Sequence, residues 1–232
     1  MHKFKTLVWL RWQYLISNKV LLFVCVLTPF IDFAILQAIP MIHGEVYFLN
    51  MGLSMVYSLT AGSFTSMMIS EEKEKKNLRT LILSGVTKYD YILSVILFPF
   101  AFSILSVLFM PVIFGINVPN WVTYFIIVTL TSLTFILLNL SIGLFAKTQI
   151  HATSFSMIIL IIATFLPMIS SDTSNKFLDY LTKFSFIGAN TEYFTKLNEF
   201  HITNSSVFAI VCWVTVLFIV SNYAFNWNAK EH

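Results

Sequence analysis

Six apolar runs, each about as long as the 20 residues that a helix needs to cross a bilayer core of roughly 30 Å, constrain the fold most strongly. They cover Val20 to Ile39, Tyr47 to Ser70, Tyr91 to Gly115, Trp121 to Ala146, Thr153 to Ser170 and Ser206 to Asn226. A 57% share of hydrophobic residues and a mean hydropathy of +0.81 exclude an ordinary soluble domain. We therefore predict an all-α membrane protein in which residues 1–232 form a single transmembrane domain with six transmembrane helices.

The basic residues predict how the chain is oriented in the membrane. If the N-terminus is inside, eleven of the fourteen Lys and Arg residues face the cytoplasm, and only Lys176, Lys183 and Lys196 face outward. Because Lys and Arg are retained on the cytoplasmic side of membrane proteins, both termini are expected to be cytoplasmic in a multi-pass protein of the cell membrane. The net charge of +3 then reflects topology, so no nucleic-acid partner is inferred from it.

The N-terminal segment, residues 1–19, has an amphipathic helical pattern. Its apolar residues recur beside Arg11 and Lys19, and Trp9 and Trp12 suit the headgroup region. We predict an interfacial helix on the inner leaflet. The alternative is an N-terminal extension of the first span, which would place Arg11 and Lys19 at a costly membrane depth.

The connection before the last span, residues 171–205, is long enough to hold short helices. Phe177, Leu178, Leu181 and Phe184 recur at helical spacing, and a second amphipathic piece is indicated over residues 192–200. Amphipathic helices on the outer leaflet are one interpretation. A hairpin that dips into the protein interior is the other, and it requires its backbone to be buried against other helices.

Motifs for catalysis and for direct nucleotide binding are missing from the sequence. There is no phosphate-binding loop that ends in Gly-Lys-Ser/Thr, no His-Glu-x-x-His zinc helix and no Gly-x-Ser-x-Gly elbow. The five histidines are scattered along the chain and form no ligand set. We expect no catalytic residue, no metal site and no enzymatic activity on this chain.

Three polar residues lie within the predicted spans. Asp32 follows Pro29 by one turn and is the acidic residue placed at membrane depth, so it is a candidate for a substrate or proton site. Its alternative is a carboxyl group that is neutral or hydrogen-bonded near the outer boundary. Asn50 and Asn139 could line a translocation path, but interhelical hydrogen bonding is the more common role of such residues.

A charged island at residues 71–90 separates the second and third spans. Seven of its first nine residues are Glu, Lys or Arg, so it cannot lie in lipid. Leu78, Leu81 and Ile82 then fall on one helical face, which is the pattern of a cytosolic docking helix. A plain solvated loop is the alternative, but it would not need these apolar residues.

The island resembles the signature of type-2 ABC transporter permeases, which reads roughly E-R-E-x-G-T-L-E-x-L-L-x-S-P-V-S-R-x-E-I-L. Glu72 and Glu74 match its paired acids. Leu78, Leu81 and Ile82, which we call the apolar ridge, match its apolar positions, and residues 84–90 match its turn into the third span. Two positions depart from the signature, because Lys76 stands where Gly is usual and Gly85 where Pro is usual.

The resemblance implies a half-transporter whose coupling helix fits a cleft of a separate ABC ATPase subunit. The residues that would contact the ATPase are Glu72, Glu74, Leu78, Leu81, Ile82, Ser84 and Lys88. ATP and magnesium would bind to that ATPase, and a second permease subunit, identical or different, would complete the export route. A hydrophobic peptide, a bacteriocin or a drug-like amphiphile is the expected bacterial export substrate, and a polysaccharide is the alternative. The rival hypothesis is a stand-alone secondary transporter or channel that uses Asp32.

Overall fold

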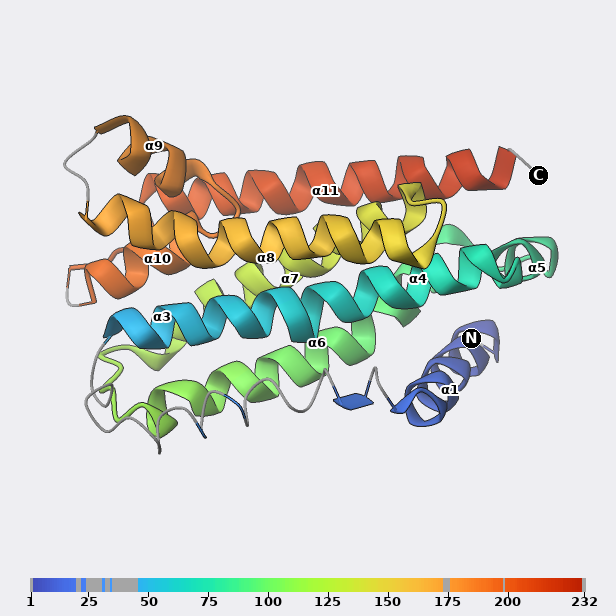
Figure 1. Ribbon diagram of the computed structural model, residues 1–232, viewed down its shortest axis with the longest axis horizontal. Helices are drawn as coiled ribbons and strands as arrows, with labels where there is room; N and C mark the ends of the chain where they lie inside the picture. The colour runs from blue at the N-terminus through green and yellow to red at the C-terminus, as the bar shows by residue number, and fades with distance from the viewer. Residues whose placement is uncertain are drawn as a thin grey trace.

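The computed structural model describes residues 2–19, 22–23, 31, 34, 46–172, 176–197 and 199–230. All secondary structure in these ranges is helical, and Figure 1 shows its arrangement. The elements are α1 (His2–Ser17), α3 (Val46–Met55), the π-helix η2 (Val56–Ser63), α4 (Phe64–Glu74), α5 (Asn77–Leu83), α6 (Lys88–Ile113), α7 (Trp121–Phe145), α8 (Gln149–Asp172), α9 (Lys176–Phe184), α10 (Gly188–Thr195) and α11 (Ser205–Lys230).

Long helices run side by side and form the body of the molecule (Figure 1). Four stretches in the described ranges are long and apolar enough to cross a membrane: Lys88–Ile113, Trp121–Phe145, Gln149–Pro167 and Ser205–Asn228. They coincide with the third to sixth predicted spans. The predicted second span is helical throughout but is divided by η2, and the first lies largely outside the described residues. The all-helical class is therefore confirmed, while the count of six stays a prediction.

The π-helix η2 continues α3 into α4 without a break, since Met55, Ser63 and Phe64 all have right-handed helical backbone angles. Within it the hydroxyl of Ser63 donates to the carbonyl of Ser58, five residues earlier, at 3.1 Å. A π-helical turn widens the helix locally and shifts the register of the residues that follow. It brings Gly62 directly against α7, as described below.

Two clusters of buried apolar side chains form the core, one toward each end of the bundle. The first includes Tyr57, Tyr124 and Phe135 together with Ile187 and Tyr193 from the segment before α11. The members of the second cluster that matter for the site are Leu15, Met68, Leu78, Tyr91 and Phe225. Helix α7 packs against both ends of the bundle, because it contacts η2, α4, α6, α8, α10 and α11.

The connection before α11 differs in part from its prediction. Helix α9 forms as expected, and Phe177, Leu181 and Phe184 face outward. Helix α10, however, covers Gly188–Thr195 instead of residues 192–200, and it is buried on most sides against α3, α7 and α11. A Cβ atom on Gly188 would lie 2.2 Å from the carbonyl oxygen of Lys183, so the turn between α9 and α10 requires glycine.

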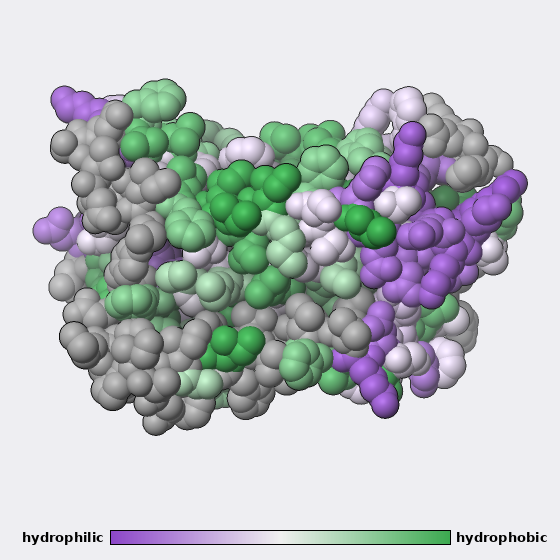
Figure 2. Space-filling view, viewed as in Figure 1, coloured by the Kyte–Doolittle hydropathy of each residue, from purple (hydrophilic) through white to green (hydrophobic). Residues whose placement is uncertain are grey.

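Hydrophilic residues gather at one end of the molecule. Helix α1, helix α5 and the C-terminal end of α11 all lie at this end (Figure 1). Figure 2 shows hydrophilic side chains concentrated there and hydrophobic ones across the middle. This distribution fits a bilayer around the middle of the bundle, and the side of the membrane that each chain end faces stays a prediction.

Candidate functional site

The predicted coupling segment, residues 71–90, forms a short helix between two turns. Helix α4 ends at Glu74, and Lys76 then turns the chain with a left-handed backbone angle, φ 60°. Helix α5 follows, and Gly85, with φ 75°, ends it as glycine does at many helix C-termini. The segment is thus an ordered helical projection between α4 and α6.

Side-chain caps fix the return from α5 into α6. The Thr87 hydroxyl accepts a hydrogen bond from the backbone N–H of Asp90 at 3.2 Å and donates to its carboxylate at 2.8 Å. Such an N-cap contributes about 1 kcal/mol to helix stability. At the end of α5 the Ser84 hydroxyl donates to the carbonyl of Leu81 at 2.7 Å. The orientation of α5 is therefore tied to the first turn of α6.

A buried ionic contact joins α1, α4 and α6 beneath α5. The Nη1 group of Arg11 donates to one carboxylate oxygen of Glu72, and the hydroxyl of Tyr91 donates to the other at 2.9 Å. The guanidinium carbon lies 5.1 Å from the centre of the Tyr91 ring. Arg11 is 1% and Glu72 4% exposed, so each charge depends on this cluster of Arg11, Glu72 and Tyr91, which we call the clasp.

A second contact attaches α1 to α4 at the rim of the clasp. The hydroxyl of Tyr14 donates to Glu71, which also forms an ion pair with Lys75. Burial and the hydrogen bond to Glu71 raise the pKa of Tyr14, so its hydroxyl keeps its proton and remains the donor. The hydrogen bond to Glu71 likewise raises the pKa of Lys75. Helix α1 is thereby held against α4 by two adjacent acidic residues.

The residues predicted to contact the ATPase divide into buried and exposed groups. Glu72 belongs to the clasp, and Leu78 is only 3% exposed, so both side chains are largely covered within this chain. Leu81 and Ile82 are half-buried and pack on the same apolar cluster as Leu78. The predicted apolar ridge therefore holds α5 on the bundle.

The remaining predicted contact residues lie at the surface or near it. Glu74 is exposed, and its carboxylate accepts the backbone N–H of Gln149 at 3.0 Å, which ties α4 to the start of α8. Ser84 is exposed at the end of α5, and the ammonium of Lys88 lies 5.0 Å from the Tyr89 ring centre. Leu83 is the last residue of α5 and is not one of the three residues of the predicted apolar face. It is 74% exposed and is the apolar residue that α5 presents outward.

The two asparagines considered for a translocation path lie in separate hydrogen-bond networks. Asn50 accepts from the Asn190 amide at 2.7 Å, and Tyr57 donates to Asn190 at 3.1 Å. Asn139 accepts from the Ser156 hydroxyl at 2.7 Å. Both asparagines thus make the interhelical bonds that such residues commonly make, and their role in translocation stays a prediction. Asp32 lies outside the described residues.

Sequence reasoning missed several members of these sites. Arg11 was read as an interfacial cation, but with Leu7 and Leu15 it forms a buried stripe at four-residue spacing. That spacing was visible in the sequence, whereas its acidic partner, sixty-one positions away, was not. In the described ranges no three His, Cys, Asp or Glu side chains are grouped as a metal ion would require.

Comparison with known proteins places this architecture in a transporter family. The chain matches the family model described as ABC-2 family transporter protein over residues 44–223, a range that contains every element from α3 to α10 and most of α11. A search of curated proteins found no match to the chain. Because the matched range covers most of the 232 residues, it decides the family. The chain belongs to the ABC-2 transporter family, whose members are membrane permeases of ABC transporters.

Proposed function

We propose that this chain is the permease subunit of an ATP-driven exporter and that it docks a separate ATPase through the outward face of α5. ATP and Mg²⁺ bind to the ATPase in this scheme, and no catalytic step takes place on the permease. The observation that carries the proposal is Leu83, a large apolar side chain that is 74% exposed on a helix whose other leucines pack inward. Exposed apolar anchors of this kind mark protein–protein contacts.

The attachments of α5 explain how motion of the ATPase would reach the membrane. One turn connects α5 to α4 and another connects it to α6, with the Thr87 cap fixing the second. The clasp adds α1 to the same unit. Because the two turns and the clasp join these helices, a displacement of α5 would move α1, α4 and α6 together as one body.

The export route would form between this chain and a second permease, either identical or different. Helices α6, α8 and α11 present large apolar side chains outward along much of their length, which suits contact with lipid or with that second subunit. Such surfaces would suit an amphiphilic substrate such as a hydrophobic peptide, a bacteriocin or a drug-like compound.

Replacing Leu83 with aspartate tests the docking proposal. A carboxylate in an apolar contact lacks a partner and is costly to bury, and loss of a central contact residue typically weakens binding by 2 kcal/mol or more, about thirtyfold. We therefore expect Leu83→Asp to insert into the membrane at the normal level but to lose co-purification with its ATPase. Leu83 is better suited to this test than Leu81, because Leu81 also supports the folded position of α5.

A matched control is Ile202→Asp, which adds the same carboxylate to an exposed aliphatic position between α10 and α11. This connection lies at the end of the bundle opposite α5 (Figure 1). The control should retain the ATPase. Undiminished co-purification of the ATPase with Leu83→Asp would contradict docking through this face.

A further inference from the structure

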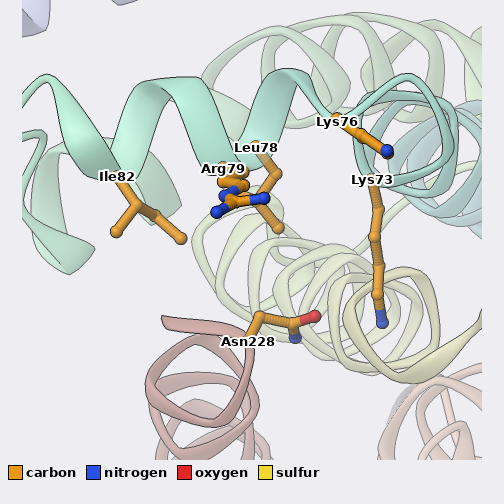
Figure 3. Close-up of a pocket in the computed structure, with 6 residues that line it drawn as sticks. All are labelled: Lys73, Lys76, Leu78, Arg79, Ile82 and Asn228. Carbon is orange, nitrogen blue, oxygen red and sulfur yellow. The ribbon is translucent and has the colours of Figure 1, made fainter. Parts of the chain in front are cut away.

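A small cleft separates α5 from the C-terminal end of α11. It has a volume of about 130 Å³ and is lined by Lys73, Lys76, Leu78, Arg79, Ile82 and Asn228. Figure 3 shows Leu78 and Ile82 extending from α5 toward Asn228, with Lys73 reaching in from the end of α4. A cavity needs only about 10–15 Å³ to hold one water molecule, so this cleft can admit a larger group such as phosphate.

The lining of the cleft is strongly basic. Three of its six residues are Lys or Arg, and none is acidic. Within the described part of the chain neither Lys76 nor Arg79 takes part in an ion pair. The ammonium group of Lys73 donates to the Leu144 carbonyl at 2.6 Å, and the Asn228 amide donates to the same oxygen at 3.0 Å. These bonds hold two of the lining side chains in place.

The backbone of Lys76 gives an independent reason to assign the cleft a function. Among the described residues, Lys76 is the one non-glycine residue with a positive φ. A left-handed conformation is unfavourable for any residue with a Cβ atom, and glycine would relieve it. Backbone strain of this kind is concentrated at functional sites, where the strained residue has a role in binding or catalysis. In this structure the side chain of Lys76 supplies one of the three positive charges of the cleft.

Aromatic residues near the cleft indicate its depth in the membrane. Tyr223 and Trp227 are exposed on the last turns of α11, and Trp9 and Trp12 are exposed on α1 at the same end of the bundle. Trp and Tyr are enriched at the level of the lipid headgroups. Asn228, which lines the cleft, follows Trp227 in the chain, so we expect the cleft at the level of the lipid headgroups.

We propose that this cleft binds the phosphate group of an anionic membrane lipid. Arg79 can hold two phosphate oxygens through its planar guanidinium, and Lys73 and Lys76 add point charges. Leu78 and Ile82 provide an apolar wall for the adjoining glycerol and acyl carbons. Basic pockets between membrane helices bind anionic headgroups in this way. A bound lipid would lie between α5 and the C-terminal end of α11 and contact both.

The test compares the full-length chain in nanodiscs of phosphatidylcholine alone and of phosphatidylcholine mixed with phosphatidylglycerol. The melting temperature of the wild type should rise as the phosphatidylglycerol fraction increases, because a ligand that binds the folded state stabilises it. Arg79→Ala and Lys76→Ala should each weaken the apparent lipid affinity about fivefold, as expected for one charge near a membrane surface. Lys147→Ala removes an exposed charge at the same end without touching the cleft and should respond like the wild type.

Lys76→Gly keeps the proposal testable if alanine disturbs the turn. Glycine relieves the left-handed backbone, so this variant should melt no lower than the wild type in phosphatidylcholine, yet gain less from phosphatidylglycerol. Inorganic phosphate added to phosphatidylcholine nanodiscs forms the second arm. A response to phosphate as large as the response to the lipid would assign the site to a soluble phosphate compound and overturn a lipid occupant.

Two further outcomes would overturn the proposal. If Lys147→Ala lost as much of the lipid response as Arg79→Ala, the response would come from general surface charge and not from the cleft. A wild-type melting temperature that does not rise with the phosphatidylglycerol fraction would show that the cleft binds no anionic lipid. None of these measurements depends on transport or on the ATPase, so they can fail independently of the proposed function.

Discussion

The clasp shows how much a single buried charge can depend on its neighbours. Arg11 is the buried cation of helix α1, and burial lowers the pKa of its guanidinium. The guanidinium nevertheless remains charged, because arginine does not deprotonate in proteins. Glu72 neutralises it, and Tyr91 satisfies the second carboxylate oxygen. Three helices are thus connected by one acid that sequence analysis had placed in an intermolecular contact.

Neutralising Glu72 should therefore destabilise the protein more than neutralising its exposed neighbour. Glu72→Gln leaves Arg11 as an unpaired buried charge, and breaking a buried pair from one side typically costs about 3–5 kcal/mol. Glu74→Gln is the matched control, for which a loss below about 1 kcal/mol is expected because the position is exposed. Thermal unfolding in detergent measures both.

The double variant Arg11→Met with Glu72→Gln sharpens the same experiment. Removing both charges leaves no unpaired ion, so it should recover much of the stability lost in Glu72→Gln alone. If the double variant were as unstable as the sum of the two single variants, the two charges would not be coupled and the clasp would have to be abandoned.

At the scale of elements, the π-helix η2 places a glycine where two helices approach closely. A Cβ atom on Gly62 would lie 2.5 Å from the amide nitrogen of Asn139 on α7. The same asparagine accepts a hydrogen bond from the Ser156 hydroxyl. That hydroxyl is also within hydrogen-bond distance of the Ser66 hydroxyl, at 2.7 Å. The packing of η2, α7 and α8 therefore depends on one small residue and one amide side chain.

Gly62→Ala should destabilise this contact, although alanine ordinarily favours a helix over glycine by about 1 kcal/mol. The added methyl group displaces the Asn139 amide and strains its bond to Ser156, and overpacking of this kind typically costs about 1–3 kcal/mol. The control is a double-mutant cycle with Asn139→Ala, which vacates the space that the methyl group needs. Strictly additive losses of melting temperature in the cycle would contradict a direct clash.

At the scale of the whole molecule, the sequence predicted the helical class and the apolar spans better than it predicted the site. Spans follow from the lengths of apolar runs, and the charged island had to be a separate segment because its charges exclude it from lipid. The burial of Leu78 and the position of α10 were not foreseen. Each depends on which neighbour covers a helical face, and helical periodicity does not identify that neighbour.

Orientation is the property of the whole molecule that charge predicts and that an accessibility experiment can decide. A background that carries Cys25→Ser and Cys212→Ser removes the two native thiols, of which that of Cys212 is exposed. Ser84→Cys then places one thiol at the end of α5, and Ile202→Cys places one at the opposite end of the bundle, both at exposed positions.

Because eleven of fourteen basic residues are assigned to the side of α5, we expect that side to be cytoplasmic. A membrane-impermeant maleimide added to intact cells should label Ile202→Cys and leave Ser84→Cys unmodified. Opening the membrane with detergent should then expose Ser84→Cys, which also controls for its reactivity. Labelling of Ser84→Cys in intact cells would place α5 outside the cell. A cytoplasmic ATPase could then not bind to α5.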